Sequence, residues 1–451
     1  MKWIYGKQDW KSFERGQENC YLLTNGLGGF SSATMIGSVS RNDHALLMAC
    51  VHAPNHRYNM VHRLSEQVTL EGDSHMISSQ EFADGTREDG WRYLEEFSYE
   101  DTPVWRFLVE GVQVRKEISV EQGTNTAAVC YEITNRSSRM CDFTVTPFFQ
   151  FTPKGSEPKP SQVFEREEGC VRSNGLSLYF WTDAEVKEIP EISEVYFYSY
   201  DDWDGRRPTG LAKANHRICK TVNPGEKCRL ELVYSMETTE KKAASILAGH
   251  RAYRKKLEEL AGFSSELAAF LAKSANQFVS RRESTDGETI LAGFPFFEDW
   301  GRDTMIALPG ICISTRQYGT AREILRTFAA YEKDGLMPNL FPEGGEAPLY
   351  NTVDAALLFI NCVYLYYQAT GEKAFVREMY PVAERIVKSY RQGTHFGIHM
   401  DEDGLIMAGQ ELDQVTWMDV RVGEFLPTPR HGKPVEINAY WYNALQIMAC
   451  F

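Results

Sequence analysis

The chain contains 451 residues, of which 43% are hydrophobic and 24% charged, and its formal net charge at neutral pH is −14. This composition is typical of a soluble globular protein. Because single domains usually have ~100–200 residues, the length predicts two or more hydrophobic cores. The acidic charge argues against a nucleic-acid partner, since no basic stripe is present to displace counterions from a phosphate backbone. A neutral polysaccharide would not be repelled by this charge.

The ten cysteines are scattered along the chain, and no two have the C-x-x-C spacing of a zinc site. Scattered thiols in a long chain are typical of reduced core residues, which predicts a cytoplasmic protein. The first ten residues lack the apolar core of a signal peptide, and apolar runs such as 45–51 are far shorter than the ~20 residues of a membrane span. We therefore expect no membrane partner, no metal and no cofactor.

Residues 1–240 alternate between apolar and polar side chains with the period of a β-strand. Val129, Tyr131 and Ile133, for example, are separated by single residues, and such runs end at turn dipeptides such as Asn25-Gly26 and Asp84-Gly85. A sequence with so many short alternating runs predicts an N-terminal antiparallel β-sandwich. Two longer stretches, 153–160 and 201–208, are expected to be loops.

The period changes to that of helices after residue 240. Residues 241–262 predict a linker helix and residues 263–451 a helical domain. We expect helices near 264–281, 303–317, 320–332, 353–369, 373–392 and 435–450. Thr320 and Glu323 fit a capping box that would start the third of these helices, and Asp334-Gly335 would end it. The stretch from Ala355 to Tyr367 is apolar nearly all round, which predicts a helix buried on several sides.

The motif at 296–304 combines a cation, several carboxylates and an indole just before a helical run. The guanidinium of Arg302 and the carboxylate of Asp303 could hold adjacent hydroxyl groups of a sugar ring, while Trp300 could pack against its C–H face. The alternative is an ordinary helix start, with Asp303 near the positive end of the helix dipole and Arg302 in a salt bridge.

Further motifs follow in a fixed order, at 335–339, 350–355, 416–419 and 428–438. In this order and at this spacing, the set resembles the glucosidase half of glycogen debranching enzymes, the amylo-α-1,6-glucosidases. Two upstream segments, 24–30 and 41–47, resemble the N-terminal domain of the bacterial and archaeal members. The resemblance implies that the predicted helices form the first half of an (α/α)6 toroid, as in six-hairpin glycosidases.

Hydrolysis of an acetal requires a carboxylic acid near the leaving oxygen and a second carboxylate for the attacking water. Asp419 follows Trp417 and Met418, whose apolar side chains could raise its pKa by desolvation, as a general acid requires. The resemblance likewise implies that Asp419 is the acid, because related enzymes place this residue after a Trp at the start of the sixth helix. The alternative is a helix N-cap.

The resemblance also implies that Arg302 and Asp303 hold the non-reducing-end glucose. The other candidate substrate-binding residues are Trp300, Asn339, Asn351, Asp354, Trp417, Arg430, Lys433 and Glu436. Each has an ordinary structural alternative: turn formation for the Asn residues, core packing for the two Trp residues, and a solvated loop for 430–436. The implied substrate is an α-glucan, namely glycogen, limit dextrin or a branched malto-oligosaccharide.

In the family that the chain resembles, the catalytic base is a Glu near the end of the toroid, so we expect it beyond residue 451 and expect this chain to be a truncated form. A half toroid would leave helix faces such as 355–367 uncovered, which predicts self-association and no glucosidase activity. The main prediction is an inverting α-1,6-glucosidase of glycogen breakdown. The alternatives are another (α/α)6 glycosidase, similar to glucoamylase or trehalase, and a non-catalytic carbohydrate-binding fragment.

Overall fold

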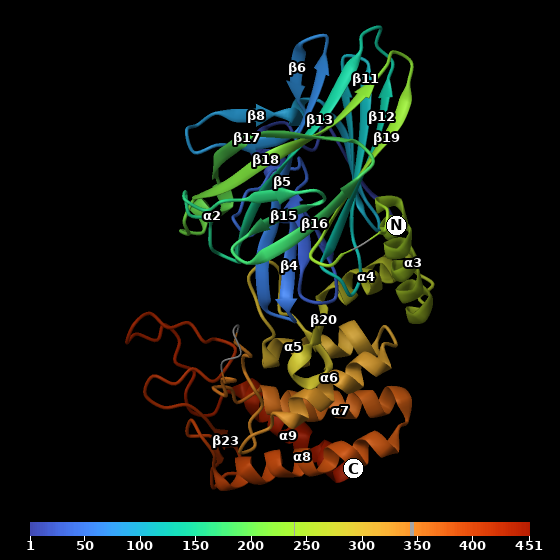
Figure 1. The fold of residues 1–451 in the computed structure, drawn as a ribbon. Coiled ribbons are helices and arrows are strands. Elements are labelled where there is room, and N and C mark those ends of the chain that lie inside the picture. Colours follow the sequence, from blue (N-terminus) through green and yellow to red (C-terminus); the bar gives the residue numbers. More distant parts are fainter. Residues whose placement is uncertain (239, 343–346) are drawn as a thin grey trace. The chain divides into compact units, whose positions relative to one another are not determined.

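The computed structural model describes residues 1–238, 240–342 and 347–451. The chain divides into two compact units, Met1–Lys256 and Leu257–Phe451. The first unit is rich in β-strands and the second in helices, as the change of period predicts (Figure 1).

Two large antiparallel sheets form the first unit. The larger sheet, among the described residues, has nine strands in the order β1 (Trp3–Gly6), β9 (Leu94–Tyr99), β10 (Pro103–Val109), β11 (Val112–Val120), β12 (Thr126–Asn135), β19 (Lys227–Ser235), β16 (Leu176–Thr182), β15 (Cys170–Ser173) and β14 (Glu165–Glu167). The second sheet has the order β17 (Glu185–Phe197), β18 (Thr209–Val222), β13 (Cys141–Pro153), β5 (His56–Leu70), β4 (Ala45–His52), β3 (Phe30–Thr34) and β2 (Cys20–Thr24), with β6 (Asp73–Met76) paired to β5.

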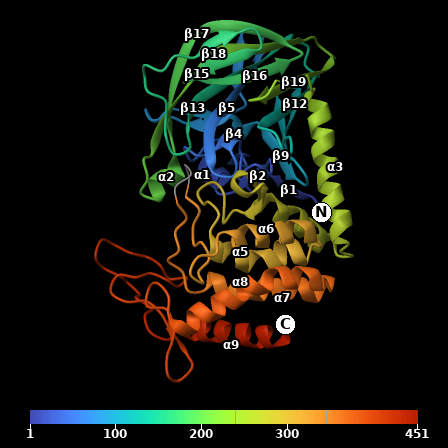
Figure 2. The same ribbon diagram turned by 60° about the horizontal axis from the view of Figure 1, so that its bottom comes forward.

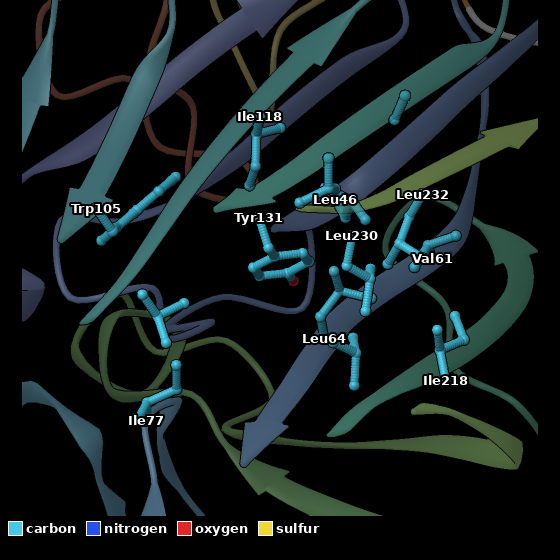
Figure 3. Close-up of a cluster of buried hydrophobic side chains, with 14 of the residues drawn as sticks. Leu46, Val61, Leu64, Ile77, Trp105, Ile118, Tyr131, Ile218, Leu230 and Leu232 are labelled. Atoms are coloured by element: carbon cyan, nitrogen blue, oxygen red, sulfur yellow. The ribbon is translucent and has the colours of Figure 1, made fainter. Parts of the chain in front are cut away.

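The smaller elements of this unit are α1 (Phe13–Gln17), the strand pair β7 (Ser79–Glu81) and β8 (Arg87–Asp89), the turn η1 (Gly90–Arg92), and α2 (Ser199–Trp203) between β17 and β18. The apolar core lies between the two large sheets. Trp105, Ile118 and Tyr131 of the larger sheet belong to one buried cluster with Val61 and Leu64 of the second (Figure 3). The alternation predicted for β12 is present, because Val129 and Tyr131 are fully buried in this core.

The helix α3 (Ala243–Ala261) follows the last strand and packs on the opposite face of the larger sheet. Its residues Ala243 and Ile246 form a small buried cluster with Ala128 of β12 and Val233 of β19. Ala128 and Val233 pair with one another across the two strands, so their side chains lie on the same face of the sheet. The observed helix corresponds to the linker helix expected at 241–262.

The second unit contains six α-helices among its described residues. They are α4 (Glu266–Ala275), α5 (Gly301–Leu308), α6 (Tyr318–Ala330), α7 (Ala355–Thr370), α8 (Lys373–Gln392) and α9 (Val435–Cys450). The predicted bounds of the last three are correct to within two residues. Two strand pairs complete the unit: β20 (Val279–Arg282) with β21 (Gly287–Ile290), and β22 (His399–Met400) with β23 (Ile406–Met407). The short turns η2 (Asn276–Phe278) and η3 (Glu283–Thr285) flank β20.

Three details of the predicted helices are wrong. The helix expected at 264–281 ends at Ala275, and the chain then enters β20. The helix expected at 303–317 is α-helical only to Leu308 and continues as the π-helical turn η4 (Pro309–Ile313), in which Ser314 N–H donates to the Pro309 carbonyl five residues earlier. The predicted capping box is absent, because α6 begins at Tyr318 and Thr320 therefore lies inside the helix.

Helix α7 is the centre of the second unit. It contacts α5, α6, α8 and α9, and Phe359 and Ile360 are fully buried (Figures 1 and 2). The expectation that this helix would be left uncovered is therefore wrong. Exposed apolar side chains occur instead on α9, where Val435 and Tyr442 are 84% and 66% exposed. In the described chain, no helix is both long and apolar enough to cross a membrane.

Candidate active site

The start of α5 is held against the 338–340 segment by a close backbone approach. A Cβ atom on Gly301 would lie 1.9 Å from the Pro338 carbonyl oxygen, so only glycine fits this position. The Gly301 N–H donates to the Asn339 carbonyl at 2.9 Å, and Trp300 forms an isolated bridge with Leu340. This contact places Asn339 beside the first turn of α5, which carries Arg302.

Arg302 is oriented by a buried ion pair. Its Nε donates to Asp354 Oδ2 at 2.6 Å, and both side chains are at least 92% buried. The second oxygen of Asp354 accepts a 2.6 Å hydrogen bond from the Thr352 hydroxyl. Arg302 therefore does form the salt bridge that its structural interpretation expects. Because both carboxylate oxygens of Asp354 are engaged within the protein, its main effect in the structure is to hold the guanidinium in one orientation.

Three buried polar atoms on these residues, whose backbones are adjacent, have no hydrogen-bond partner in the described protein: Nη2 of Arg302, Nε1 of Trp300 and Oδ1 of Asn339. Leaving such an atom buried and unpaired costs ~1–3 kcal/mol, more for a charged group. Native structures therefore rarely contain several together unless a ligand or water satisfies them. Two N–H donors and one amide oxygen can satisfy the hydroxyl groups of a polar, uncharged ligand.

Two further carboxylates lie close to the same guanidinium. Asp419 Oδ2 is 3.6 Å from Arg302 Nη1. Asp303 is solvent-exposed, yet its pKa is raised, because partial burial of the carboxylate and the charges of Asp354 and Asp419 together outweigh the attraction of Arg302. We refer to Trp300, Arg302, Asp303, Asn339, Asp354 and Asp419 as the Arg302 cluster.

The local structure around Asp419 differs from the sequence-based expectation. No helix begins there: residues 411–434 have no helix among them, and the next one, α9, starts at Val435. Asp419 is therefore neither a helix N-cap nor the first residue of a sixth helix. The apolar enclosure expected from Trp417 is also absent, since Trp417 is 56% exposed and the Asp419 side chain 37% exposed. The indole of Trp417 lies against the guanidinium of Arg430, 5.4 Å from ring centre to Cζ.

The remaining candidates are bound mainly to other protein groups. Arg430 and Glu436 pair through two contacts of 2.5 and 2.7 Å. Burial alone would raise the pKa of Glu436, but the hydrogen bonds and charge of Arg430 outweigh it and the net pKa is lowered. Lys433 pairs at 2.7 Å with Asp401 and with Asp403, next to the β22–β23 hairpin, rather than with the Arg302 cluster.

Asn351 links the loop before α7 to the segment that precedes Asp419. Its Nδ2 donates to the Gln414 carbonyl at 3.4 Å, and the Val353 N–H donates to the Val415 carbonyl at 2.8 Å. The buried hydroxyl of Tyr390 on α8 also donates to the Val353 carbonyl at 2.8 Å. These bonds fix the position of Asp354, and through it Arg302, from two other parts of the unit.

Sequence reasoning missed a second buried ion pair beneath the motif. Arg282 of β20 pairs with the fully buried Asp299, which also accepts a 3.0 Å hydrogen bond from the Thr289 hydroxyl. The Arg282 guanidinium lies 4.0 Å from the ring centre of Phe341, and burial lowers its pKa to about 10. Asp299 directly precedes Trp300, so this pair anchors the start of the site. Its carboxylate, which lies within the 296–304 motif, therefore has a structural partner.

The described residues contain no group of three or more His, Cys, Asp or Glu side chains that could hold a metal ion. The site is therefore composed of carboxylates, guanidinium groups, amides and indoles. Such a set can bind hydroxyl groups and transfer protons.

Two family models match the chain: the glycogen debranching enzyme N-terminal model over residues 19–228 and the amylo-alpha-1,6-glucosidase model over residues 273–451. The glycogen debranching enzyme of Saccharomyces cerevisiae is 29% identical, in a match that covers 42% of this chain and 16% of that protein. The chain thus spans less than a fifth of the length of this curated relative.

Two solved structures share a distant likeness. A bacterial glucoamylase complexed with acarbose has a TM-score of 0.46 at 10% identity, over 87% of this chain and 59% of that one. A GalM/aldose epimerase homologue from C. elegans has a TM-score of 0.29 at 9% identity, over 48% of this chain and 98% of that one. The two family models together span most of the sheet-rich and helical units, and the chain belongs to the glycogen debranching enzyme family.

Proposed function

We propose that the Arg302 cluster binds the terminal glucose of an α-glucan, in a glycoside hydrolase that removes α-1,6-linked glucose from branch points of glycogen or limit dextrin. The observation that carries this proposal is the group of three buried, unpaired polar atoms on Trp300, Arg302 and Asn339. They lie in the half of the chain matched by the amylo-alpha-1,6-glucosidase model. Each would gain a hydrogen bond from a sugar hydroxyl.

The geometry suggests a division of roles at the sugar. Asp354 holds Arg302 through Nε, so that Nη2 remains to donate to a hydroxyl oxygen. Trp300 Nε1 donates in the same way, and Asn339 Oδ1 accepts. The exposed carboxylate of Asp303 accepts from a further hydroxyl group. One glucose residue would then be bound by charged groups, Arg302 and Asp303, and by neutral groups, Trp300 and Asn339. A buried site of this kind rejects sugars that lack the matching hydroxyl group.

For the reaction, we propose that Asp419 is the general acid. Its proton passes to the glycosidic oxygen as the bond from that oxygen to the anomeric carbon breaks, and the rest of the glucan leaves as an alcohol. A water molecule attacks the anomeric carbon from the opposite face, which gives glucose of inverted configuration. The proton of this water passes to a second carboxylate that acts as general base, which we assign to none of the described residues. In this proposal the six helices are part of an (α/α)6 toroid, with Asp419 in the loop before its sixth helix.

The test compares two substrates in a form of the protein that releases glucose. We expect Asp419→Asn to abolish release from a malto-oligosaccharide with one α-1,6-linked glucose branch, because an amide cannot protonate the leaving oxygen. Loss on glucosyl fluoride should be at least ~100-fold smaller, since fluoride needs little acid assistance and acid catalysis contributes ~10²–10⁴-fold. Asp286→Asn, at an exposed side chain on the β20–β21 turn, is the matched control. Equal losses on the two substrates would remove Asp419 from the role of acid.

A further inference from the structure

The sheet-rich unit contains a cavity that the proposed function does not use. Its volume is about 770 Å³, within the range of ~300–1,000 Å³ typical of small-molecule sites. Three segments form it: residues 42–43 before β4, the 155–160 loop after β13, and residues 201–209 between β17 and β18. All of them belong to the unit Met1–Lys256. The first segment lies in the 41–47 motif, for which sequence analysis found no chemical role.

The cavity wall is built by hydrogen bonds between these segments. The Gly155 N–H donates to Asp43 Oδ1 at 2.8 Å, and the Asn42 N–H donates to Asp201 Oδ2 at 2.8 Å. The amide of Asn42 donates to the Ser156 carbonyl at 2.9 Å. Asn42 and Asp43 therefore join the 155–160 loop to the segment from Asp201 to Thr209. The loop predicted at 201–208 is only partly correct, because residues 201–203 belong to α2.

The charged groups of the wall balance one another. Asp43, Glu157 and Asp201 line the cavity together with Lys159, Arg206 and Arg207, and Glu157 pairs with Arg207. A phosphate or another anion would meet three carboxylates. A polyhydroxylated neutral molecule can instead donate to the carboxylates and accept from the cations.

The two aspartates are suited to accept hydroxyl hydrogen bonds. Asp43 and Asp201 are only 7% and 4% exposed, and burial raises the pKa of both carboxyls in spite of nearby cations. Asp201 also accepts from the Arg41 guanidinium at 3.4 Å, so a ligand hydroxyl would add to the protein donors that each carboxylate already has. Hydroxyl donors from a ligand would stabilise the charged forms.

An exposed tryptophan lies close in sequence to the residues that line the cavity. Trp203, the last residue of α2, lies between the cavity-lining Asp201 and Arg206, and 81% of its surface is exposed. An indole is costly to leave in water and is usually buried at least in part. Trp203 does not itself line the cavity, but a flat exposed indole so near to two lining residues in sequence is suited to pack on the C–H face of a sugar ring.

From the cavity, its balanced polar wall and Trp203 together, we infer a second carbohydrate site in the sheet-rich unit, which binds a chain of α-linked glucose units apart from the Arg302 cluster. The choice of glucan as ligand rests on the proposed function, whereas the cavity and the exposed indole do not. Such a site would hold one outer chain of a branched glucan.

Calorimetric titration of the full 451-residue chain with maltoheptaose tests this inference. The parent for these titrations carries Arg302→Lys, which weakens the Arg302 cluster. We expect this parent to retain one binding event, and Trp203→Ala and Arg206→Ala each to weaken it at least about fivefold. Both residues are exposed, so truncation should leave the fold intact, and matching melting curves check this. The control is Arg217→Ala, at an exposed position of β18 in the same unit, which should bind as the parent does.

The outcomes separate the two sites. If Arg302→Lys alone removes all binding, or if both cavity variants bind as well as the parent, the second site is refuted while the proposed function stands. If Arg302→Lys leaves wild-type binding unchanged but Trp203→Ala abolishes it, the proposed role of Arg302 fails and the second site stands. Competition by millimolar inorganic phosphate for the remaining binding event would show an anion site and would also overturn the inference.

Discussion

Gly301→Ala is the substitution that probes most directly how the fold builds the site. The new Cβ would lie 1.9 Å from the Pro338 carbonyl oxygen, whereas ordinary contacts begin at 3.4 Å, so one backbone must move by about 1.5 Å. Overpacking of this kind costs ~1–3 kcal/mol. The upper part of that range applies here because the obstacle is backbone rather than a flexible side chain. The 2.9 Å bond from Gly301 N–H to Asn339 O would also break.

Urea unfolding and calorimetric titration with a glucose-terminated oligosaccharide measure the two effects. We expect the free energy of unfolding to fall by about 2 kcal/mol and ligand affinity to fall at least about tenfold, since Asn339 moves away from Arg302. Gly319→Ala is the matched control. Its Cβ meets nothing within 4 Å and it lies in α6, so stability should stay equal or rise by ~0.5–1 kcal/mol. A Gly301→Ala protein with wild-type stability and affinity would refute the reasoning.

Two further predictions concern pH and packing. The pKa of Asp303 is raised, so its charged form is disfavoured in the fold. The protonated side chain therefore contributes stability below the unfolded-state pKa of ~3.9, and this stability is lost as pH rises through the folded-state pKa. Asp303→Asn should therefore raise the melting temperature at pH 7 relative to wild type, with the difference vanishing below about pH 4; a pH-independent difference would contradict this. Ile360→Ala, at a fully buried position of α7, should lower the free energy of unfolding by ~2–5 kcal/mol in urea, and a loss below ~1 kcal/mol would show that α7 is not the packing centre of its unit.

The sequence pattern predicts much of the secondary structure because strands and helices each leave a period of apolar residues within a short stretch of chain. The alternation at Val129 and Tyr131 corresponds to β12, and the bounds expected at 373–392 and 435–450 are those of α8 and α9. The hairpin of β20 and β21 was missed because strands of four residues are too short to show a period of two. The capping box failed because a Thr and a Glu three residues apart also occur inside helices, as at Thr320 in α6.

The site depends on contacts that no local pattern contains. Arg302 pairs with Asp354, 52 residues later, and Arg282 pairs with Asp299, 17 residues later and beyond the β20–β21 hairpin. Sequence motifs pointed to Arg302 and Asp354 separately. They could not show that one orients the other, nor that Asp299 has a structural partner. The exposure of Trp417 could not be predicted from the sequence either, because the segments that cover a loop residue are distant in the chain.

The most direct measurement of the central claim is the affinity of the 451-residue chain, carrying Trp203→Ala to weaken the proposed second site, for a malto-oligosaccharide with one α-1,6-linked glucose branch, before and after Arg302→Lys. Lysine keeps the charge but cannot both pair with Asp354 and donate from Nη2, so a buried acceptor loses its partner at a cost of ~1–3 kcal/mol. The account predicts affinity for this ligand about 5- to 150-fold weaker in the variant. Unchanged affinity in a folded protein after Arg302→Lys would show that the Arg302 cluster does not bind glucose.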